Sequence, residues 1–433
     1  MTVRLPLSAA QTGVWVAQQL DPDDRSFNIA EYCDIQGPVD RALFEAALRE
    51  VVAATPALRA RFGLGEEGLC QDIDDTVDVP LVYEDVSAAP DPRAAAERRM
   101  RRDLERTYDL ATGPLFTWAL FKAGPERYFW YRAAHHVVVD GFGLSLVAAH
   151  VADVYTSLVT GRPRRPRPPG TLAEAVAADT AYQESPEFAA DRRYWLARMA
   201  DQTEVASLAD RQPPRTRSYV RHSGHLGPGD VDALRAAARR LEVTWPEVVL
   251  AAVAVLLHRA TGVRDIVLGL PVTGRTAPML RRVPAMLTNT VPLRVTVTPE
   301  RTFAEVVTEV SVRLAEAVEH QRYPQERLVR ELPGLPEGRK QFGPDVNIMS
   351  FGFGNGYAGH PATVHNLAAG PVEDLTVNVY DRLDGQGLQI SLDGNDALYG
   401  RTELAGHLDA FLGLLRSVPD LLDGEAVGQG AAR

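Results

Sequence analysis

Two adjacent histidines are followed by an aspartate and a glycine in the stretch HHVVVDG, residues 135–141. A histidine suits general acid–base chemistry because its ordinary pKa lies close to neutral pH. Asp140 can orient a ring, form a buried ion pair or cap a following helix, and spacing alone does not choose among these roles. Gly141 permits a tight turn and leaves a main-chain N–H open to a developing oxyanion. The stretch is the candidate site, although such a pair is also commonly one core and one surface histidine.

The spacing does not favour a metal site or a serine hydrolase. In a strand, His135 and His136 point to opposite faces, and no third ligand stands at a metal-site spacing. The chain has no Gly-x-Ser-x-Gly elbow, the motif that presents a nucleophilic serine. Cys33 and Cys70 are the only cysteines, too few for a disulfide framework and not spaced as metal ligands. We therefore expect no metal and no bound cofactor.

Length and composition limit the class of protein and its partners. A chain of 433 residues suits two domains of about 200 residues each. The formal net charge of -11 argues against a general nucleic-acid binder, which needs a strongly basic surface. The N-terminal stretch has no apolar run of signal-peptide length, and no later run reaches the length of a membrane span. We expect a cytoplasmic protein that acts on small molecules or proteins, with neither nucleic acid nor membrane as a partner.

The histidines must be positioned by the strands before them and the helix after them. Aromatic and apolar residues predict two antiparallel strands, 115–122 and 127–135, joined by a turn that contains glycine and proline. The second strand delivers both histidines to its end, where only one of the two rings can face a cleft. Apolar residues at helical spacing then predict a helix from 144 to 160.

A stretch rich in arginine and proline, residues 161–170, marks the best domain boundary. Proline removes main-chain donors and fixes φ, so this stretch suits neither a helix nor a central strand. We predict an N-terminal lobe, residues 1–170, that carries HHVVVDG, and a C-terminal lobe, residues 171–433. Each lobe mixes helices and strands without strict alternation, which indicates an α/β fold of the α+β type with helices covering each sheet.

HHVVVDG matches, position for position, the HHxxxDG signature of the condensation domains of nonribosomal peptide synthetases, which are relatives of chloramphenicol acetyltransferase. Further stretches resemble other motifs of this family, in the family's order along the chain. These stretches are 8–22, 57–62, 268–275, 286–294 and 320–324. Pro56 departs from the second motif, in which an RHExLR pattern is usual. The likeness spans essentially the whole chain, so the resemblance does not rest on one motif.

The resemblance implies two chloramphenicol-acetyltransferase-like lobes that form a V-shaped pseudodimer around a central tunnel. Donor and acceptor carrier proteins would enter this tunnel with their phosphopantetheine arms, and the chain itself would bind no cofactor. A carrier-bound acyl, aryl or peptidyl thioester would condense with a carrier-bound aminoacyl acceptor to form an amide. The implied setting is nonribosomal biosynthesis of an antibiotic or a siderophore, with an adenylation domain of the same megasynthase as a further partner.

The resemblance also implies roles within the signature. It makes the second histidine, His136, the catalytic residue and His135 a structural neighbour. It makes Asp140 a structural residue that pairs with an arginine of the other lobe, for which Arg275 is the matching position. Gly141 is then the hinge of the turn. Whether His136 deprotonates the attacking amine or positions it and relays a proton stays open, because a free amine is already nucleophilic.

Other residues bear on the substrates. By similarity, Asn289 and Asn347 lie on segments of the second lobe that reach the tunnel. They read equally well as hydrogen-bonded residues at strand ends. Residues 27–32 and 131–134 resemble initiating or siderophore-type domains, which points to an acyl or aryl donor.

Two other classes of function remain open from the sequence. A free-standing acyltransferase would pass a carrier-bound acyl group to a soluble amine or alcohol, and it would need no acceptor carrier. A non-catalytic docking module would bind carriers without chemistry and would be unaffected by the substitution His136→Ala. The intact signature disfavours the docking module.

Overall fold

The chain forms two compact units in the computed structural model. The structure describes residues 2–427 apart from 67, 165–169, 203, 210–215, 333–341, 351–355, 423 and 425. The first unit consists of Met1–Ser185, Thr273–Thr288 and Phe351–Pro371, and the second of Pro186–Val272, Asn289–Ser350 and Val372–Arg433. The boundary that we predicted at residue 170 adjoins residues 165–169, which lie outside the described residues. The first unit continues beyond residue 170 and also contains two later segments of the chain. A single cut in the sequence therefore does not separate the two units.

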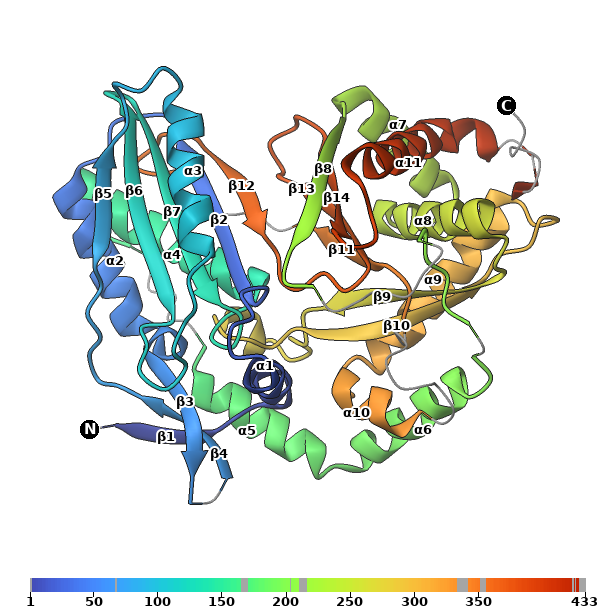
Figure 1. Ribbon diagram of the computed structural model, residues 1–433, viewed down its shortest axis with the longest axis horizontal. Coiled ribbons are helices and arrows are strands. Elements are labelled where there is room, and N and C mark those ends of the chain that lie inside the picture. Colours follow the sequence, from blue (N-terminus) through green and yellow to red (C-terminus); the bar gives the residue numbers. More distant parts are fainter. Residues whose placement is uncertain are drawn as a thin grey trace. The chain divides into compact units, whose positions relative to one another are not determined.

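The first unit is built on a five-stranded sheet with the order β12-β2-β7-β6-β5. The strands are β12 (Ala362–Ala368), β2 (Asn28–Ile35), β7 (Arg127–His135), β6 (Phe116–Gly124) and β5 (Leu81–Asp85). All neighbours pair antiparallel except β5, which is parallel to β6. Figure 1 shows β12 alongside β2, although the two strands lie far apart in the sequence. The predicted strand 127–135 is confirmed, and its partner runs from Phe116 to Gly124.

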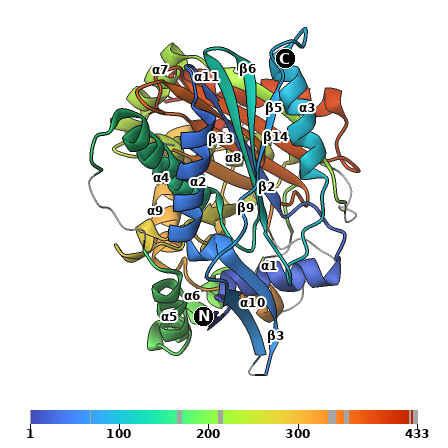
Figure 2. The same cartoon turned by 90° about the vertical axis from the view of Figure 1, so that its left-hand side faces the viewer.

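Helices cover both faces of this sheet. Helices α2 (Arg41–Ala54) and α4 (Gly141–Thr160) pack against each other on one face, over Trp118 and Trp130. Figure 2 shows these two helices side by side. Helix α3 (Pro92–Leu104) covers the opposite face. Alternate residues along β6 and β7 therefore enter two different apolar clusters, as the strand period requires.

Helix α4 follows the histidine stretch and is the most apolar long helix of the first unit. It begins at Gly141, three residues before the predicted start, because Asp140 caps it. Among the described helices, α4 alone is long and apolar enough to cross a bilayer by itself, and half of that stretch is buried inside the fold. Buried core helices of globular proteins have the same composition.

Smaller elements complete the first unit. Strands β1 (Val3–Pro6), β4 (Gly68–Ile73) and β3 (Ala60–Gly65) form a three-stranded sheet in the order β1-β4-β3. Helix α1 (Ala9–Leu20) starts with a capping box in which Ser8 and Gln11 exchange hydrogen bonds. The remaining elements are α5 (Leu172–Gln183) and the short 3₁₀ helices Pro56–Arg59 and Leu280–Arg282.

The second unit is built on a six-stranded sheet with the order β10-β9-β11-β13-β14-β8. Its strands are β10 (Asn289–Thr296), β9 (Asp265–Val272), β11 (Asp345–Met349), β13 (Leu375–Asp381), β14 (Leu388–Asn395) and β8 (Tyr219–Leu226). Its helices are α6 (Pro186–Met199), α7 (Pro228–Arg240), α8 (Trp245–Thr261), α9 (Phe303–Glu319), α10 (Gln325–Glu331) and α11 (Arg401–Leu421). One large apolar cluster joins the sheet to these helices. The predicted mixed α/β architecture without strict alternation is confirmed.

Candidate active site

His135 is the last residue of β7 and is almost completely buried. Its Nε2 atom lies 2.8 Å from Oε1 of Gln18, and its Nδ1 atom accepts a hydrogen bond from the main-chain N–H of Val137. The Gln18 amide donates to three main-chain carbonyls in the turn 21–24, so its oxygen must face the ring. The imidazole therefore carries its proton on Nε2 and is held in one neutral form.

The surroundings of His135 oppose a positive charge. Burial, together with the charge of the neighbouring His136, lowers the pKa of His135 to about 3. The rings of Phe27 and Tyr108 flank the imidazole, with centroids 6.1 and 6.2 Å away. His135 is thus a neutral packing residue that joins the end of β7 to helix α1.

His136 lies one residue past the end of β7 and is only partly buried. Its Nδ1 atom is buried and has no hydrogen-bond partner among the described residues. Burial lowers the pKa of the ring, although the negative charge of Asp140 and the main chain of His136 itself act in the opposite direction. At neutral pH the ring is therefore uncharged, and Nε2 is the nitrogen that is left to meet a substrate.

Gly370, just beyond β12, runs beside this ring. Its φ of +123° is a conformation that residues with side chains rarely adopt. A Cβ atom added there would lie 3.5 Å from Cδ2 and 3.7 Å from Nε2 of His136. We did not single out Gly370 in the sequence, because the local stretch Ala-Ala-Gly-Pro indicates only a loop.

Asp140 forms a buried, bidentate ion pair with Arg275. The two side chains are each 1% exposed, and Nη1 and Nη2 of Arg275 lie 2.8 and 3.0 Å from the two carboxylate oxygens. The same carboxylate accepts hydrogen bonds from the N–H of Gly143, from the N–H of Leu287 and from both the N–H and the hydroxyl of Thr288. A buried charge is tolerated when it is paired and hydrogen-bonded in this way.

The guanidinium of Arg275 is bound on several sides. It donates to three main-chain carbonyls of the segment 273–285 and lies 4.8 Å from the centre of the Phe142 ring. The pairing of Asp140 with Arg275 that the resemblance implied is present in the structure. Arg275 belongs to Thr273–Thr288, which is part of the first unit, so both members of the pair lie within that unit.

Two of the three roles that the sequence left open for Asp140 are present together. The residue is both the ion-pair partner of Arg275 and the N-cap of α4. Burial raises the pKa of its carboxyl, but Arg275 and the N–H donors outweigh burial and hold the pKa below its usual value. Among the described residues, no hydrogen bond joins this carboxylate to the His136 ring, so Asp140 acts on the pKa of the ring through its charge.

The glycine with a clear steric role is Gly143, not Gly141. Gly141 is the first residue of α4, its φ is not in the left-handed region, and an added Cβ would meet no atom within 4 Å. The expected hinge role of Gly141 therefore finds no support in the backbone. At Gly143, an added Cβ would lie 2.6 Å from the Val139 side chain and 3.1 Å from the main chain of Ala285. Because Gly143 has no Cβ, the segment that contains Arg275 can pack against the start of α4.

The two asparagines differ in how much of their hydrogen-bonding capacity is used. Asn289 donates to the carbonyls of Gln321 and Tyr323 and accepts from the N–H of Gln325. Its amide thus ties β10 to the loop before α10, which matches the strand-end interpretation. Asn347 on β11 donates weakly to Asn378 over 3.4 Å, and its carbonyl oxygen has no hydrogen-bond partner among the described residues.

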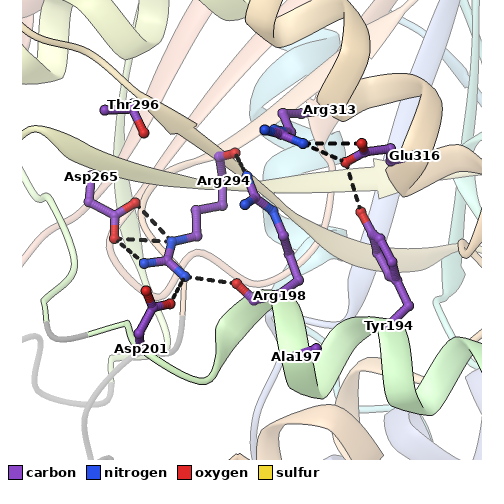
Figure 3. A pocket seen from close by; sticks show the side chains of 9 residues that line it. All are labelled: Tyr194, Ala197, Arg198, Asp201, Asp265, Arg294, Thr296, Arg313 and Glu316. Carbon is purple, nitrogen blue, oxygen red and sulfur yellow. Dashed lines mark hydrogen bonds and ion pairs between the residues drawn. The ribbon is translucent and has the colours of Figure 1, made fainter.

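The second unit has a charged hollow of about 590 Å³ between α6, α9 and the β9–β10 edge (Figure 3). Arg294 is paired with Asp265 and Asp201, and Arg313 with Glu316. Arg198 donates to the carbonyl of Arg294, and Arg294 donates in return to the carbonyl of Arg198. The charges largely neutralise one another and join α6 to β10. Unlike the His136 stretch, the hollow has no histidine among its lining residues.

Comparison with known proteins identifies the family. The family model described as a condensation domain matches residues 2–424. The chain is 45% identical over 422 residues to the dimodular nonribosomal peptide synthase of Bacillus subtilis (strain 168), covering 97% of this chain and 18% of that protein. It is 47% identical over 429 residues to the isonitrile lipopeptide synthase of Streptomyces coeruleorubidus, covering 98% of this chain and 29% of that protein. The chain thus spans less than a third of either relative.

Solved structures agree with this assignment. A variant of the starter condensation domain of rhizomide synthetase, in complex with C8-CoA, has a TM-score of 0.92 and 36% identity, covering 99% of this chain and 97% of that chain. The first condensation domain of the calcium-dependent antibiotic synthetase, with a substrate analogue, has a TM-score of 0.91 and 34% identity, covering 99% of each chain. Members of this family are acyltransferases that form amide bonds. The chain belongs to the condensation domains of nonribosomal peptide synthetases.

Proposed function

We propose that the chain joins a carrier-bound acyl thioester to a carrier-bound aminoacyl amine, with His136 as the catalytic residue. The observation that carries this proposal is the position of the His136 ring, which is partly exposed and lies one residue past the end of β7, where burial lowers its pKa. The Asp140–Arg275 pair supports it by fixing the turn that follows the ring. Phosphopantetheine arms of a donor and an acceptor carrier protein would deliver the two substrates.

The reaction is an acyl transfer. The acceptor nitrogen attacks the thioester carbonyl, a C–N bond forms, the C–S bond breaks, and the nitrogen loses one proton. The sulfur leaves as the thiol of the donor arm and takes up one proton. A neutral His136 can orient the amine, receive the first proton and return it to the sulfur, so the ring is unchanged after each turnover. A lowered pKa suits this role because the ring is already uncharged at neutral pH.

We propose an acyl donor rather than a peptidyl donor, as in an initiating condensation domain. The similar isonitrile synthase makes a lipopeptide, and the similar rhizomide domain is a starter domain described with C8-CoA. The resemblance of residues 27–32 and 131–134 to initiating or siderophore-type domains points the same way. The enterobactin synthase component F of Escherichia coli (strain K12), 28% identical over 413 residues, leaves an aryl donor as the second choice.

The wider setting extends the same proposal. The V-shaped pair of lobes and its tunnel would bring both arms to His136, and the side-chain oxygen of Asn347, which has no hydrogen-bond partner among the described residues, would line the path of one substrate. Donor and acceptor carriers would be the main partners, with an adenylation domain of the same synthetase nearby. The relatives are several times longer than this chain, which is consistent with partners on the same polypeptide. We expect the reaction to take place in the cytoplasm.

Mass spectrometry of intact carriers tests the proposal. The chain is incubated with a donor carrier loaded with a C8 acyl group and an acceptor carrier loaded with leucine. We expect the acyl group to appear on the acceptor carrier as an N-acyl leucyl thioester. Transfer to free leucine or leucinol in the absence of an acceptor carrier would instead identify a free-standing acyltransferase. No transfer beyond the rate without protein, together with carrier binding, would identify a docking module.

A further inference from the structure

The missing side chain of Gly370 leaves open space beside the proposed catalytic ring. The only described atoms within 4 Å of an added Cβ, apart from the chain neighbours of Gly370, are Cδ2 and Nε2 of His136. Gly370 lies at the end of the segment that contains β12, and both it and His136 belong to the first unit. The contact is therefore a property of one compact unit.

Backbone strain alone does not account for this arrangement. Gly359, on the same segment, also has a positive φ, +87°, yet an added Cβ there would meet nothing within 4 Å. Both positions disfavour a side chain because of their φ, but only Gly370 faces a reactive group. The two glycines therefore separate the effect of φ from the effect of the space beside His136.

A methyl group at position 370 would occupy the approach to Nε2 without colliding with the ring. Separations of 3.5 and 3.7 Å are ordinary van der Waals contacts, so the imidazole could keep its place. A substrate nitrogen that hydrogen-bonds to Nε2 must come to about 2.7–3.2 Å. The methyl carbon and the atoms attached to that nitrogen would then compete for the same space.

We propose that Gly370 is a positioning residue that keeps the Nε2 edge of His136 open and limits the bulk allowed next to the attacking amine. This inference rests on the function proposed above, in which an aminoacyl amine meets His136. A residue with any side chain at this position would slow the reaction, and it would do so more strongly for an acceptor with a branched side chain. The residue acts through space rather than through a chemical group of its own.

The test compares wild type, Gly370→Ala and the matched control Gly359→Ala. A C8 acyl thioester is the donor, and the N-acetylcysteamine thioesters of glycine and leucine are the acceptors. We expect Gly359→Ala to keep both rates within about twofold of wild type. We expect Gly370→Ala to lose about tenfold or more in kcat/KM with the leucyl acceptor and clearly less with the glycyl acceptor. Thermal unfolding should show similar losses of stability in both variants, because both place alanine at a positive φ.

The inference is overturned if Gly370→Ala is folded and has the same kcat/KM as Gly359→Ala with both acceptors. If Gly370→Ala does not fold, Gly370→Asn takes its place, because asparagine enters positive φ more readily. Wild-type rates in that variant overturn the inference equally. A His136→Ala control separates the two claims: if it reacts as fast as wild type, the proposed function fails and this inference fails with it. If His136→Ala is slow while folded substitutions at 370 have no effect, the inference about Gly370 alone fails.

Discussion

The carboxylate of Asp140 and the guanidinium of Arg275 form two hydrogen bonds, of 2.8 and 3.0 Å, with both side chains almost completely inaccessible to solvent. The pair joins the start of α4 to the segment Thr273–Thr288. Its acidic partner, Asp140, lies four residues after His136 in the chain. Asp140 also accepts hydrogen bonds from the N–H groups of Gly143 and Leu287, and Arg275 donates to the carbonyl of Ala285. The pair therefore fixes the turn that presents His136, although among the described residues neither side chain forms a hydrogen bond with the ring.

Removal of one partner should destabilise the protein strongly. We expect Asp140→Ala to lose about 3–5 kcal/mol of unfolding free energy, because it leaves the buried charge of Arg275 uncompensated. A matched control is Asp74→Ala, which removes a much more exposed ion pair with Arg61 and should cost no more than about 1 kcal/mol. Chemical denaturation of both variants checks the comparison. An inactive Asp140→Ala protein with wild-type stability would contradict the structural role and favour a direct chemical one.

Acid should destabilise the fold through His135. Its pKa is about 3 in the folded protein against 6.5 as the ordinary value, so between these pH values the unfolded chain binds one more proton than the folded chain. The contribution of His135 to the free energy of unfolding is fully present above pH 6.5. It declines as the pH falls, by up to about 1.4 kcal/mol per pH unit. The variant His135→Gln does not titrate and should show a shallower decline between pH 6.5 and 4.5. Equal slopes in denaturation experiments would show that His135 is not held neutral.

The titration of His136 can be observed directly. Burial lowers the pKa of its ring, and Asp140 only partly compensates, so the midpoint should lie below 6.5. NMR of protein labelled at the histidine rings would follow this resonance, assigned by its loss in His136→Ala. Asp140→Asn removes the negative charge and should lower the midpoint further, provided that the variant stays folded. A midpoint above 6.5 in the wild type would contradict an uncharged ring at neutral pH.

The two asparagines should respond differently to truncation. Asn289→Ala leaves two carbonyls and one N–H of the loop 321–325 without partners, so we expect a loss of about 1–3 kcal/mol in stability. Asn347→Ala breaks only one weak hydrogen bond and should stay within about 0.5 kcal/mol of wild type. If Asn347 meets a substrate, its variant should instead raise KM or lower kcat. Large destabilisation of Asn347→Ala without a kinetic effect would contradict that assignment.

Local patterns were sufficient to predict the two strands before the histidines and the helix after them. The strand 127–135 appears with its predicted bounds because its alternating side chains enter two separate apolar clusters. Strand β12 was missed, since Ala362–Ala368 contains histidine and asparagine and lacks clean alternation. It becomes a strand by pairing with the main chain of β2, a partner far away in the sequence. A single-sequence pattern has no signal for such pairing.

The candidate site was predictable only in part, for the same reason. The Asp140–Arg275 pair followed from the resemblance, because their spacing in the sequence says nothing about contact. Gln18 binds the ring of His135 although the two residues lie far apart in the sequence. Its only signal in the sequence was its place four residues after Val14, on the apolar side of α1. Gly370 gave no signal beyond a loop, because its role depends on where β12 ends relative to His136.

The central claim is that His136 carries the amide-forming reaction, and single-turnover kinetics test it most directly. Wild type and His136→Ala are each mixed with a C8-loaded donor carrier and a leucyl-loaded acceptor carrier, and the N-acyl product on the acceptor is followed by mass spectrometry. Thermal unfolding and carrier binding of both proteins serve as controls for folding and docking. We predict that His136→Ala forms product at least about a hundredfold more slowly, the usual contribution of a positioned acid–base residue. Equal rates in two equally folded proteins would contradict the account.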